Sequence, residues 1–326
     1  MNLTEFNQSD RCEHFSCPER SVSPAVYILL YVCSAAVVLL TVCGNLLVII
    51  SVLHFKQLHT PTNMLVLSLA VSDFFVGIFL MLPMLIWTIE SCWIFGRDFC
   101  AVFLIISGFF LSLSVYNIAL IAVDRYLALS NPFFYMNRVS VKITCVVIIF
   151  GWCVVWVYIL TLMYFSGNFT RSGECFYILN EVWSVIDLVI TFIFPLSVII
   201  ILYTLVFVIA KKHATAIREL NNHTRPKTQK IPSHSMKSER KAARILSILV
   251  SVFLVCLLPY FIYSLLGNII ELQIETILKL ITILYLNSTI NPVIYALFYL
   301  WFRRCIKLII TLQIFQKDSA LIKVLS

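Results

Sequence analysis

Seven long apolar stretches constrain the fold of this chain more than any other feature of its sequence. They run approximately over residues 25–53, 62–87, 98–130, 141–164, 182–210, 241–267 and 277–300. Each exceeds the roughly 18 residues that mark a membrane-spanning helix. Because lipid satisfies no backbone N–H or C=O group, only helices and closed barrels cross a bilayer, and a barrel needs alternating segments that this sequence lacks. We therefore predict an all-α membrane protein built as a seven-transmembrane helix bundle.

Composition excludes the main soluble alternative. Of 326 residues, 61% are hydrophobic and 12% charged, and the mean hydropathy is +0.96. A soluble domain averages roughly 45–50% apolar and about 25% charged residues. Too few polar side chains remain to coat a water-soluble globule, which excludes a cytosolic enzyme. We expect an extracellular segment over residues 1–24, the bundle over 25–300, and an amphipathic helix with a cytoplasmic tail over 301–326.

The distribution of Lys and Arg predicts the orientation. With the N-terminus outside, the outer segments hold five of these residues and the cytoplasmic ends hold the other 19 of the 24. Cytoplasmic loops carry such an excess, so the net charge of +8 reflects topology rather than nucleic-acid binding. We predict a multi-pass plasma-membrane protein with an extracellular N-terminus. Asn2, Asn7 and Asn168 then lie outside in Asn-x-Ser/Thr sequences that could be glycosylated.

Five of the 11 cysteines fall on the oxidising side: Cys12, Cys17, Cys92, Cys100 and Cys175. An odd number leaves at least one without a partner among them. Cys100 starts the third span and Cys175 lies in the loop before the fifth, so a bridge between them would hold that loop over the bundle. Cys12 could pair with Cys17 or Cys92. On the cytoplasmic side, Cys305 lies in the amphipathic segment and is a candidate for palmitoylation, with a free cysteine as the alternative.

Few ionisable residues lie within the spans, and each costs roughly 2.5–3.5 kcal/mol on insertion scales. The first is Asp73 in the second span. Polar side chains at the same depth are Ser114, Asn287, Ser288 and Asn291. Carboxylate, hydroxyl and amide oxygens suit a small hard cation, so we expect a sodium site there, with a hydrated polar cluster as the alternative.

Asp124 and Arg125 end the third span at the cytoplasmic side. Arg125 could reach Glu239 at the start of the sixth span and form a pair that breaks on activation. The alternative is simple snorkelling of Arg125 to the interface. Prolines 195, 259 and 292 permit kinks in the fifth, sixth and seventh spans.

Together these residues form a pattern that resembles the rhodopsin-like (class A) G-protein-coupled receptors over nearly the whole chain. The matching landmarks are Gly44-Asn45, Leu69-Ala70-Val71-Ser72-Asp73, Trp93-Ile94-Phe95-Gly96, Cys100, Asp124-Arg125-Tyr126, Trp152, Cys175, Pro195, Tyr203, Pro259 and Asn291-Pro292-Val293-Ile294-Tyr295. The seventh span from Asn287 to Phe302 is similar to the trace amine-associated receptors in particular. That resemblance implies an olfactory amine receptor that signals through a stimulatory G protein to cAMP. It also implies that Tyr203 and Tyr295 approach Arg125 on activation.

Two departures from the family pattern concern the ligand. Most aminergic receptors have an Asp seven residues after the third-span cysteine, and this chain has Ser107 there. The usual Trp two residues before Pro259 is Leu257. Asp187 offers a replacement carboxylate, because it lies eight residues before Pro195, about 12 Å along the helix, in the outer third of the fifth span.

We therefore expect an amine ligand whose ammonium pairs with Asp187. Trp183 and Thr191 share its helix face at a spacing of four residues. Further candidates for the binding site are Ser107, as a hydrogen-bonding group, and the rings of Tyr260, Phe261 and Tyr285. A diamine would need a second carboxylate, for which Glu90, Glu174 and Glu181 at the outer rim are candidates.

Alternative functions fit less well. In a class A receptor for a non-amine small molecule, Asp187 would be structural. An opsin needs a lysine in the seventh span where this chain has Tyr285, and a transporter would show repeats or several buried charges. All six His residues lie outside the spans, so an intramembrane enzyme with a catalytic cluster is not expected.

Overall fold

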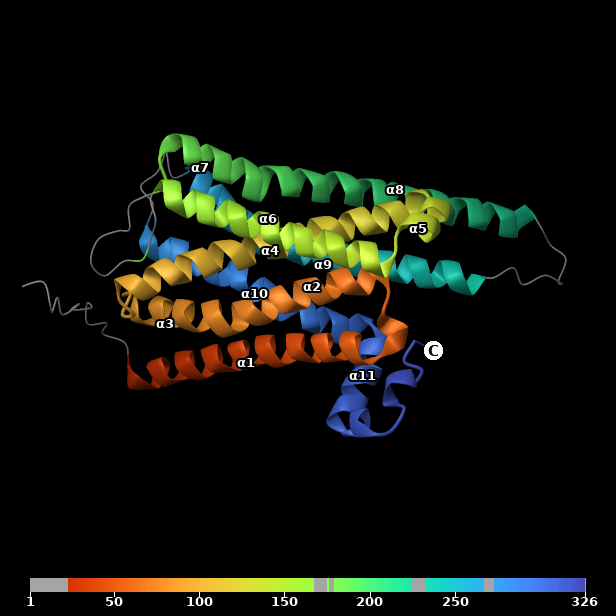
Figure 1. The fold of residues 1–326 in the computed structure, drawn as a ribbon, viewed down its shortest axis with the longest axis horizontal. Helices are drawn as coiled ribbons and strands as arrows, with labels where there is room; N and C mark the ends of the chain where they lie inside the picture. The colour runs from red at the N-terminus through yellow and green to blue at the C-terminus, as the bar shows by residue number, and fades with distance from the viewer. Residues whose placement is uncertain (1–22, 167–174, 176–178, 224–232, 267–272, 326) are drawn as a thin grey trace, which may run out of the picture.

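The computed structural model describes residues 23–166, 175, 179–223, 233–266 and 273–325 (Figure 1). These residues contain helices and turns and no β-strand. The seven spans are α1 (Pro24–His54); α2 (Pro61–Phe75), η2 (Val76–Met81) and α3 (Leu82–Glu90); α4 (Arg97–Ser130); α6 (Val141–Ser166); α7 (Glu181–Leu188), η3 (Val189–Ile193) and α8 (Phe194–His223); α9 (Ser233–Leu266); and α10 (Ile274–Phe298). The predicted seven-transmembrane bundle is confirmed.

Six of these spans are long and apolar enough to cross a membrane by length and composition, and the sixth span contains the apolar stretch Ile248–Tyr263. Short helices complete the fold: η1 (Lys56–Leu58), α5 (Pro132–Arg138), α11 (Leu300–Ile310), η4 (Gln313–Phe315) and η5 (Ser319–Leu321). The spans run side by side along the long axis of the molecule, with α5 and α11 at one end (Figure 1). Large apolar side chains are exposed on α1, α6 and α8, as expected of surfaces that face lipid.

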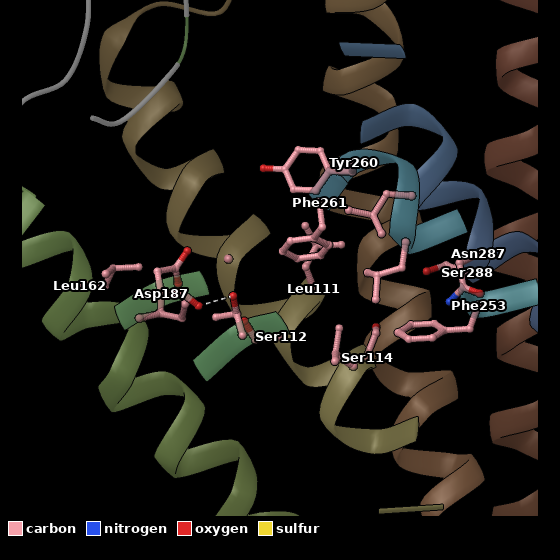
Figure 2. A pocket seen from close by; sticks show the side chains of 16 residues that line it. Leu111, Ser112, Ser114, Leu162, Asp187, Phe253, Tyr260, Phe261, Asn287 and Ser288 are labelled. Atoms are coloured by element: carbon pink, nitrogen blue, oxygen red, sulfur yellow. Dashed lines mark hydrogen bonds between the residues drawn. The ribbon is translucent and has the colours of Figure 1, made fainter. Parts of the chain in front are cut away.

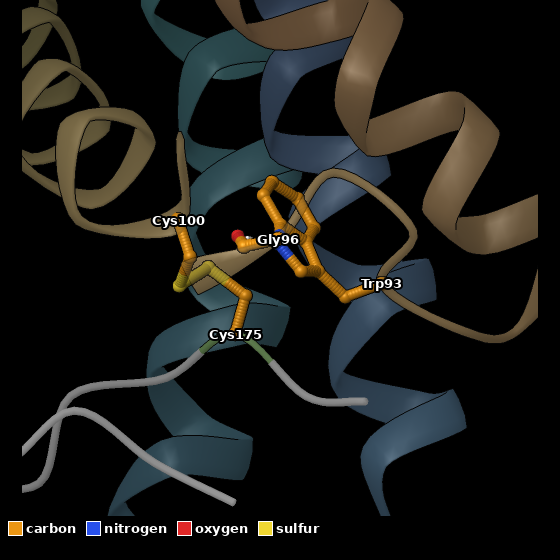
Figure 3. The surroundings of a disulfide bond; sticks show 4 residues. All are labelled: Trp93, Gly96, Cys100 and Cys175. Atoms are coloured by element: carbon orange, nitrogen blue, oxygen red, sulfur yellow. Dashed lines mark hydrogen bonds between the residues drawn. A yellow bond between two sulfur atoms is a disulfide. The ribbon is translucent and has the colours of Figure 1, made fainter. Parts of the chain in front are cut away.

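The disulfide between Cys100 and Cys175 marks one end of the bundle, which we call the disulfide end (Figure 3). The two Cα atoms are 5.6 Å apart, and the predicted bridge is confirmed. Beside it, the indole of Trp93 donates a 2.8 Å hydrogen bond to the carbonyl of Gly96. Gly96 has a φ of +82°, a conformation that favours glycine, which explains its place just before α4. Cys92 is also disulfide-bonded, and its candidate partner Cys12 lies outside the described residues.

The fifth span contains a single wide turn, the π-helix η3, placed just before Pro195. A proline nitrogen has no hydrogen to donate, so the carbonyl five residues earlier in this turn, that of Ile190, loses its partner. The hydroxyl of Tyr116 on α4 donates to that carbonyl at 2.8 Å. The third and fifth spans are thereby joined at η3.

α1 and α10 approach so closely that only glycine fits between them. A Cβ atom at Gly44 would lie 2.8 Å from the ring of Pro292. Beside this contact, the amide of Asn45 donates to the backbone carbonyl of Ser288 at 2.9 Å. The Gly-Asn pair of the first span thus positions the seventh span.

After α10 the chain turns at Tyr299 into α11, the amphipathic helix expected from the sequence. Trp301, Phe302 and Cys305 are buried on one face, whereas Arg303 and Lys307 are exposed on the other.

The palmitoylation hypothesis for Cys305 finds no support in this packing. The Cys305 side chain is fully buried, and burial raises the pKa of its thiol to about 11. Acylation needs an accessible thiolate, which this thiol does not offer.

Candidate functional site

A cavity of about 110 Å³ lies inside the bundle, between α4, α6, α7, η3, α9 and α10 (Figure 2). Its lining residues are Gly108, Leu111, Ser112, Ser114, Val115, Ile159, Leu162, Asp187, Thr191, Phe253, Leu257, Tyr260, Phe261, Leu284, Asn287 and Ser288. An engineered cavity of about 150 Å³ is known to bind benzene, so this one suits a small, slim ligand. Its wall is mainly apolar, with polar groups at two places.

The first polar place is Asp187 on α7. Its carboxylate accepts a 2.8 Å hydrogen bond from the hydroxyl of Tyr158 on α6. The Thr191 hydroxyl donates to the Asp187 backbone carbonyl at 2.7 Å. This hydrogen bond lies within the helix, so the Thr191 hydroxyl does not donate to the Asp187 carboxylate. Within the described part of the chain, Asp187 forms no ion pair. A half-buried carboxylate that has a single neutral donor among the described side chains therefore faces the cavity.

Tyr158 is the functional candidate that sequence reasoning missed. A tyrosine in the fourth span, among otherwise apolar residues, was the available signal, because a buried Tyr hydroxyl usually finds a partner. Only the packing of α6 against α7 shows that this partner is Asp187.

Four of the seven predicted ligand-binding residues line the cavity: Asp187, Thr191, Tyr260 and Phe261. The ring of Phe261 is held from behind by Phe192, which stacks on it with ring centroids 3.8 Å apart. Figure 2 shows Tyr260 and Phe261 on the side of the cavity across from Asp187. These two rings are placed to contact a ligand held at Asp187.

The other three predicted residues do not line the cavity. Trp183 stacks against Phe165 instead, with ring centroids 5.0 Å apart. Tyr285 is buried, and its hydroxyl donates to Ser107 at 3.2 Å. Ser107 stands where aminergic receptors carry their Asp, and its side chain is thus bonded to the seventh span instead of facing the cavity. The rim carboxylates Glu90 and Glu181 do not line the cavity either. Glu90 accepts a hydrogen bond from Tyr31, and Glu181 is exposed at the start of α7.

The second polar place is the cluster around Asp73, which is fully buried. Its carboxylate accepts from Ser288 at 2.8 Å, from Asn291 at 2.6 Å and from Ser114 at 3.3 Å. The structure therefore brings together the residues predicted to bind sodium. Asn287 lines the adjoining cavity, and its Oδ1 is buried without a hydrogen-bond partner among the residues that the structure describes. The same holds for Oδ1 of Asn291, so oxygen ligands for a cation are present.

At the opposite end of the bundle, Arg125 pairs with its neighbour Asp124. Asp124 also accepts from Thr62 at 2.8 Å and from Tyr135 of α5 at 2.7 Å. Burial and the bond to Asp124 raise the pKa of Tyr135. The predicted partner Glu239 lies outside the residues whose side chains are described. Tyr203 and Tyr295, the other predicted switch residues, have buried hydroxyls without hydrogen-bond partners among the described residues.

Several sequence predictions fall outside the described residues. They are the glycosylation candidates Asn2, Asn7 and Asn168, and Glu174 of the rim. No group of three or more metal-binding His, Cys, Asp or Glu side chains occurs within the described ranges.

Comparison with known proteins agrees with this architecture. Residues 44–295 match the family model of 7 transmembrane receptors (rhodopsin family). The trace amine-associated receptor 13c of Danio rerio is 36% identical, over 98% of this chain and 97% of the relative. The trace amine-associated receptor 7d of Mus musculus is 37% identical, over 94% of this chain and 88% of the relative. The trace amine-associated receptor 1 of Macaca mulatta is 34% identical, over 94% of this chain and 95% of the relative.

These matches cover nearly the full length of both partners, and they include the Asp73, Arg125 and Pro292 landmarks within the matched range. Proteins of this family are multi-pass membrane receptors and not enzymes. The chain belongs to the rhodopsin-like G-protein-coupled receptors and, among them, to the trace amine-associated receptors.

Proposed function

We propose that this receptor binds a primary amine whose ammonium group pairs with Asp187. The observation that carries the proposal is the Asp187 carboxylate, which lines the cavity and, among the described residues, has only the neutral hydroxyl of Tyr158 as side-chain partner. A carboxylate withdrawn from water without a counter-charge is costly. An ammonium group removes that cost through a charge-assisted hydrogen bond. The names of the relatives, trace amine-associated receptors, agree with an amine ligand.

The rest of the cavity suits the organic part of such a ligand. Tyr260 and Phe261 offer ring faces to a cation or an alkyl chain. Ser107 does not line the cavity, so the ammonium would sit nearer to the fifth span than in receptors with an Asp in the third. If the bond between Tyr158 and Asp187 were purely structural, the ligand would instead be a non-amine small molecule.

The output proposed from the family resemblance is activation of a stimulatory heterotrimeric G protein and a rise in cAMP, in an olfactory setting. In this scheme the N-terminus is extracellular, the disulfide end faces the outside, and activation frees Arg125 for Tyr203 and Tyr295 by breaking a pair with Glu239. Sodium, held by Asp73 with Ser114, Asn287, Ser288 and Asn291, would favour the inactive arrangement. The unpartnered amide oxygens near Asp73 support this cation site.

The decisive experiment replaces Asp187 by Asn and records amine-evoked cAMP in transfected cells. Removing one member of a buried charge pair costs about 2–5 kcal/mol, so the half-maximal amine concentration should rise about 30-fold or more. Asp98→Asn is the matched control, because this carboxylate is exposed near the disulfide end. Surface labelling confirms equal expression. An unchanged amine response in Asp187→Asn would refute the assignment and favour the non-amine alternative.

A further inference from the structure

After α11 the chain folds back on the bundle as a hook, residues 311–325, which contains η4 and η5 (Figure 1). Two hydrogen bonds join this hook to the end of α1 and to η1. The ring of His54 shares a 3.0 Å hydrogen bond with the hydroxyl of Ser319. The backbone N–H of Val324 donates to the side chain of Gln57 at 3.1 Å. The hook is therefore fixed beside the first span.

Apolar packing supports the same position. The side chain of Val324 is buried and belongs to the apolar cluster that contains Phe55, Leu58 and Cys305. Ser319 is buried as well. The hook thus covers the junction of α1, η1 and α11 and is a folded part of the receptor.

The outer surface of the hook is rich in exposed apolar side chains. Leu312, Phe315, Leu321 and Leu325 are exposed, and Ile310 at the end of α11 adds a fifth. Phe315 alone is 83% exposed. Single exposed apolar residues are normal, but a group of large ones in one short segment indicates contact with another protein or with a membrane.

The position of the hook favours the membrane. Its partner His54 follows Leu53, which is 60% exposed on a span whose outer surface faces lipid. α11 starts at Leu300, directly after the seventh span has ended at Phe298. Both neighbours of the hook therefore lie where the bundle leaves the bilayer, at the end away from the disulfide bond (Figure 1). At this depth, apolar side chains can enter the boundary between lipid headgroups and acyl chains.

The charge of the region indicates the kind of lipid. Residues 300–325 contain five basic side chains and one acidic side chain, Asp318. Arg303, Lys307, Lys317 and Lys323 are exposed. In the proposed orientation this end is cytoplasmic, and the cytoplasmic leaflet carries anionic lipids that attract Lys and Arg. Apolar insertion and electrostatic attraction together are the two signals that a stable interfacial contact requires.

We propose that the hook binds the anionic lipid surface of the cytoplasmic leaflet. Leu312, Phe315 and Leu321 enter the boundary between headgroups and acyl chains, and Lys317 and Lys323 contact lipid phosphates. The hook takes the role that an acyl chain would have, because the thiol of α11 is buried in the packing. Lipid composition then controls how firmly α11 is held against the first span. This lipid contact is independent of the amine pairing in the cavity.

The first test measures hydrogen–deuterium exchange of the backbone amides of residues 311–325 in the full-length receptor. The receptor is placed in nanodiscs of phosphatidylcholine alone or of phosphatidylcholine with phosphatidylserine. Lipid that binds only the folded hook slows its opening, and with it the exchange. Because one basic residue near an anionic surface is worth about five-fold in binding, exchange should be at least about five-fold slower in the anionic nanodiscs. Equal exchange in the two lipids would overturn the proposal.

Charge variants test the basic side chains. Lys317→Glu combined with Lys323→Glu should remove the difference between the two lipids. Lys142→Glu is the matched control and should keep the difference, because this lysine is exposed at the start of α6, at the same end of the bundle (Figure 1). All three changes affect exposed side chains, and the Tm of the bundle checks the folding of each variant. A lipid difference that survives the double reversal would contradict the role of these lysines.

An apolar variant tests insertion. Phe315→Ser should speed up exchange of the hook in both lipids, because the largest inserted side chain is lost. Phe133→Ser should not, although it removes a phenylalanine that is also 83% exposed, because this residue belongs to α5. Exchange at the wild-type rate in Phe315→Ser would show that the ring does not enter the membrane, and would refute the insertion.

Two further measurements identify the partner of the hook. Exchange should not depend on whether a nanodisc holds one receptor or two, and protection that appears only with two would assign the apolar side chains to a second copy of this chain. Hydroxylamine cleaves thioester-linked acyl chains and should leave the exchange unchanged. Faster exchange after this treatment would assign the anchoring to an acylated Cys305 and overturn the proposal.

Discussion

The bond between Tyr116 and Ile190 gives the sharpest test of how the fifth span is built. The hydroxyl of Tyr116 donates at 2.8 Å to the carbonyl of Ile190. The nitrogen of Pro195 has no hydrogen to donate to this carbonyl. Tyr116→Phe removes this donor and leaves the ring, so the change isolates one hydrogen bond. No water is present in the bilayer core to replace the hydroxyl, and the Ile190 carbonyl would remain unsatisfied.

The expected loss of stability follows from the unsatisfied Ile190 carbonyl. An unsatisfied buried acceptor costs about 1–3 kcal/mol. Chains of 150–250 residues lose roughly 2–4 °C of Tm per kcal/mol, so Tyr116→Phe should lower the Tm by about 2–12 °C. Because η3 carries Thr191 and supports Asp187 one turn away, amine affinity should fall as well.

The assay is a thermal unfolding curve of the receptor in detergent, with amine binding measured on the same preparation. Tyr164→Phe is the matched control, because it also loses a phenolic hydroxyl but its side chain is 81% exposed. A Tm for Tyr116→Phe that equals the wild-type value would refute the reasoning about Pro195. A loss in both variants alike would attribute the effect to the phenol itself rather than to this bond.

Three further predictions concern other parts of the bundle. Gly44→Val should destabilise the receptor by about 1–3 kcal/mol, seen as a lower Tm, because any Cβ there would lie 2.8 Å from the Pro292 ring. Ser107→Asp should not restore the amine-evoked cAMP response to Asp187→Asn receptors, because position 107 does not line the cavity, and a restored response in the double variant would contradict this. Cys305 should resist maleimide at pH 8 in the folded receptor and react after denaturation, because burial raises the pKa of its thiol to about 11 from 9.0. By the same linkage, the stability due to the neutral thiol is present below pH 9 and is lost as the pH rises towards 11, and unfolding curves at pH 8 and 10.5 would test it.

Most of the frame was predictable from sequence, because lipid permits few structures. Apolar length alone placed seven spans, and the match of predicted to observed bounds is closest where turns carry charge, as at α4 (Arg97–Ser130). Asp187 and Asp73 were recognised because a carboxylate in a span is rare and costly. These conclusions needed no knowledge of which helices touch.

What sequence could not predict depends on contacts between spans. The partner of Asp187 is Tyr158, from a helix with no other signal of function. Trp183 shares the helix face of Asp187 by spacing, yet it turns to Phe165 because the helix lies against α6. The bond from Tyr285 to Ser107 likewise keeps both side chains out of the cavity wall, and only the three-dimensional structure reveals it.

The wide turn η3 also makes the position of the Asp187 carboxylate depend on helical register. Each residue advances an α-helix by about 100° and 1.5 Å. Deleting one residue between Val189 and Ile193 would convert η3 to a regular turn and rotate the whole of α7 by about 100° relative to α8. Asp187 would leave the cavity wall although every side chain around it stayed the same. In this receptor, a change in the length of the fifth span would therefore alter ligand recognition as strongly as a substitution in the binding site.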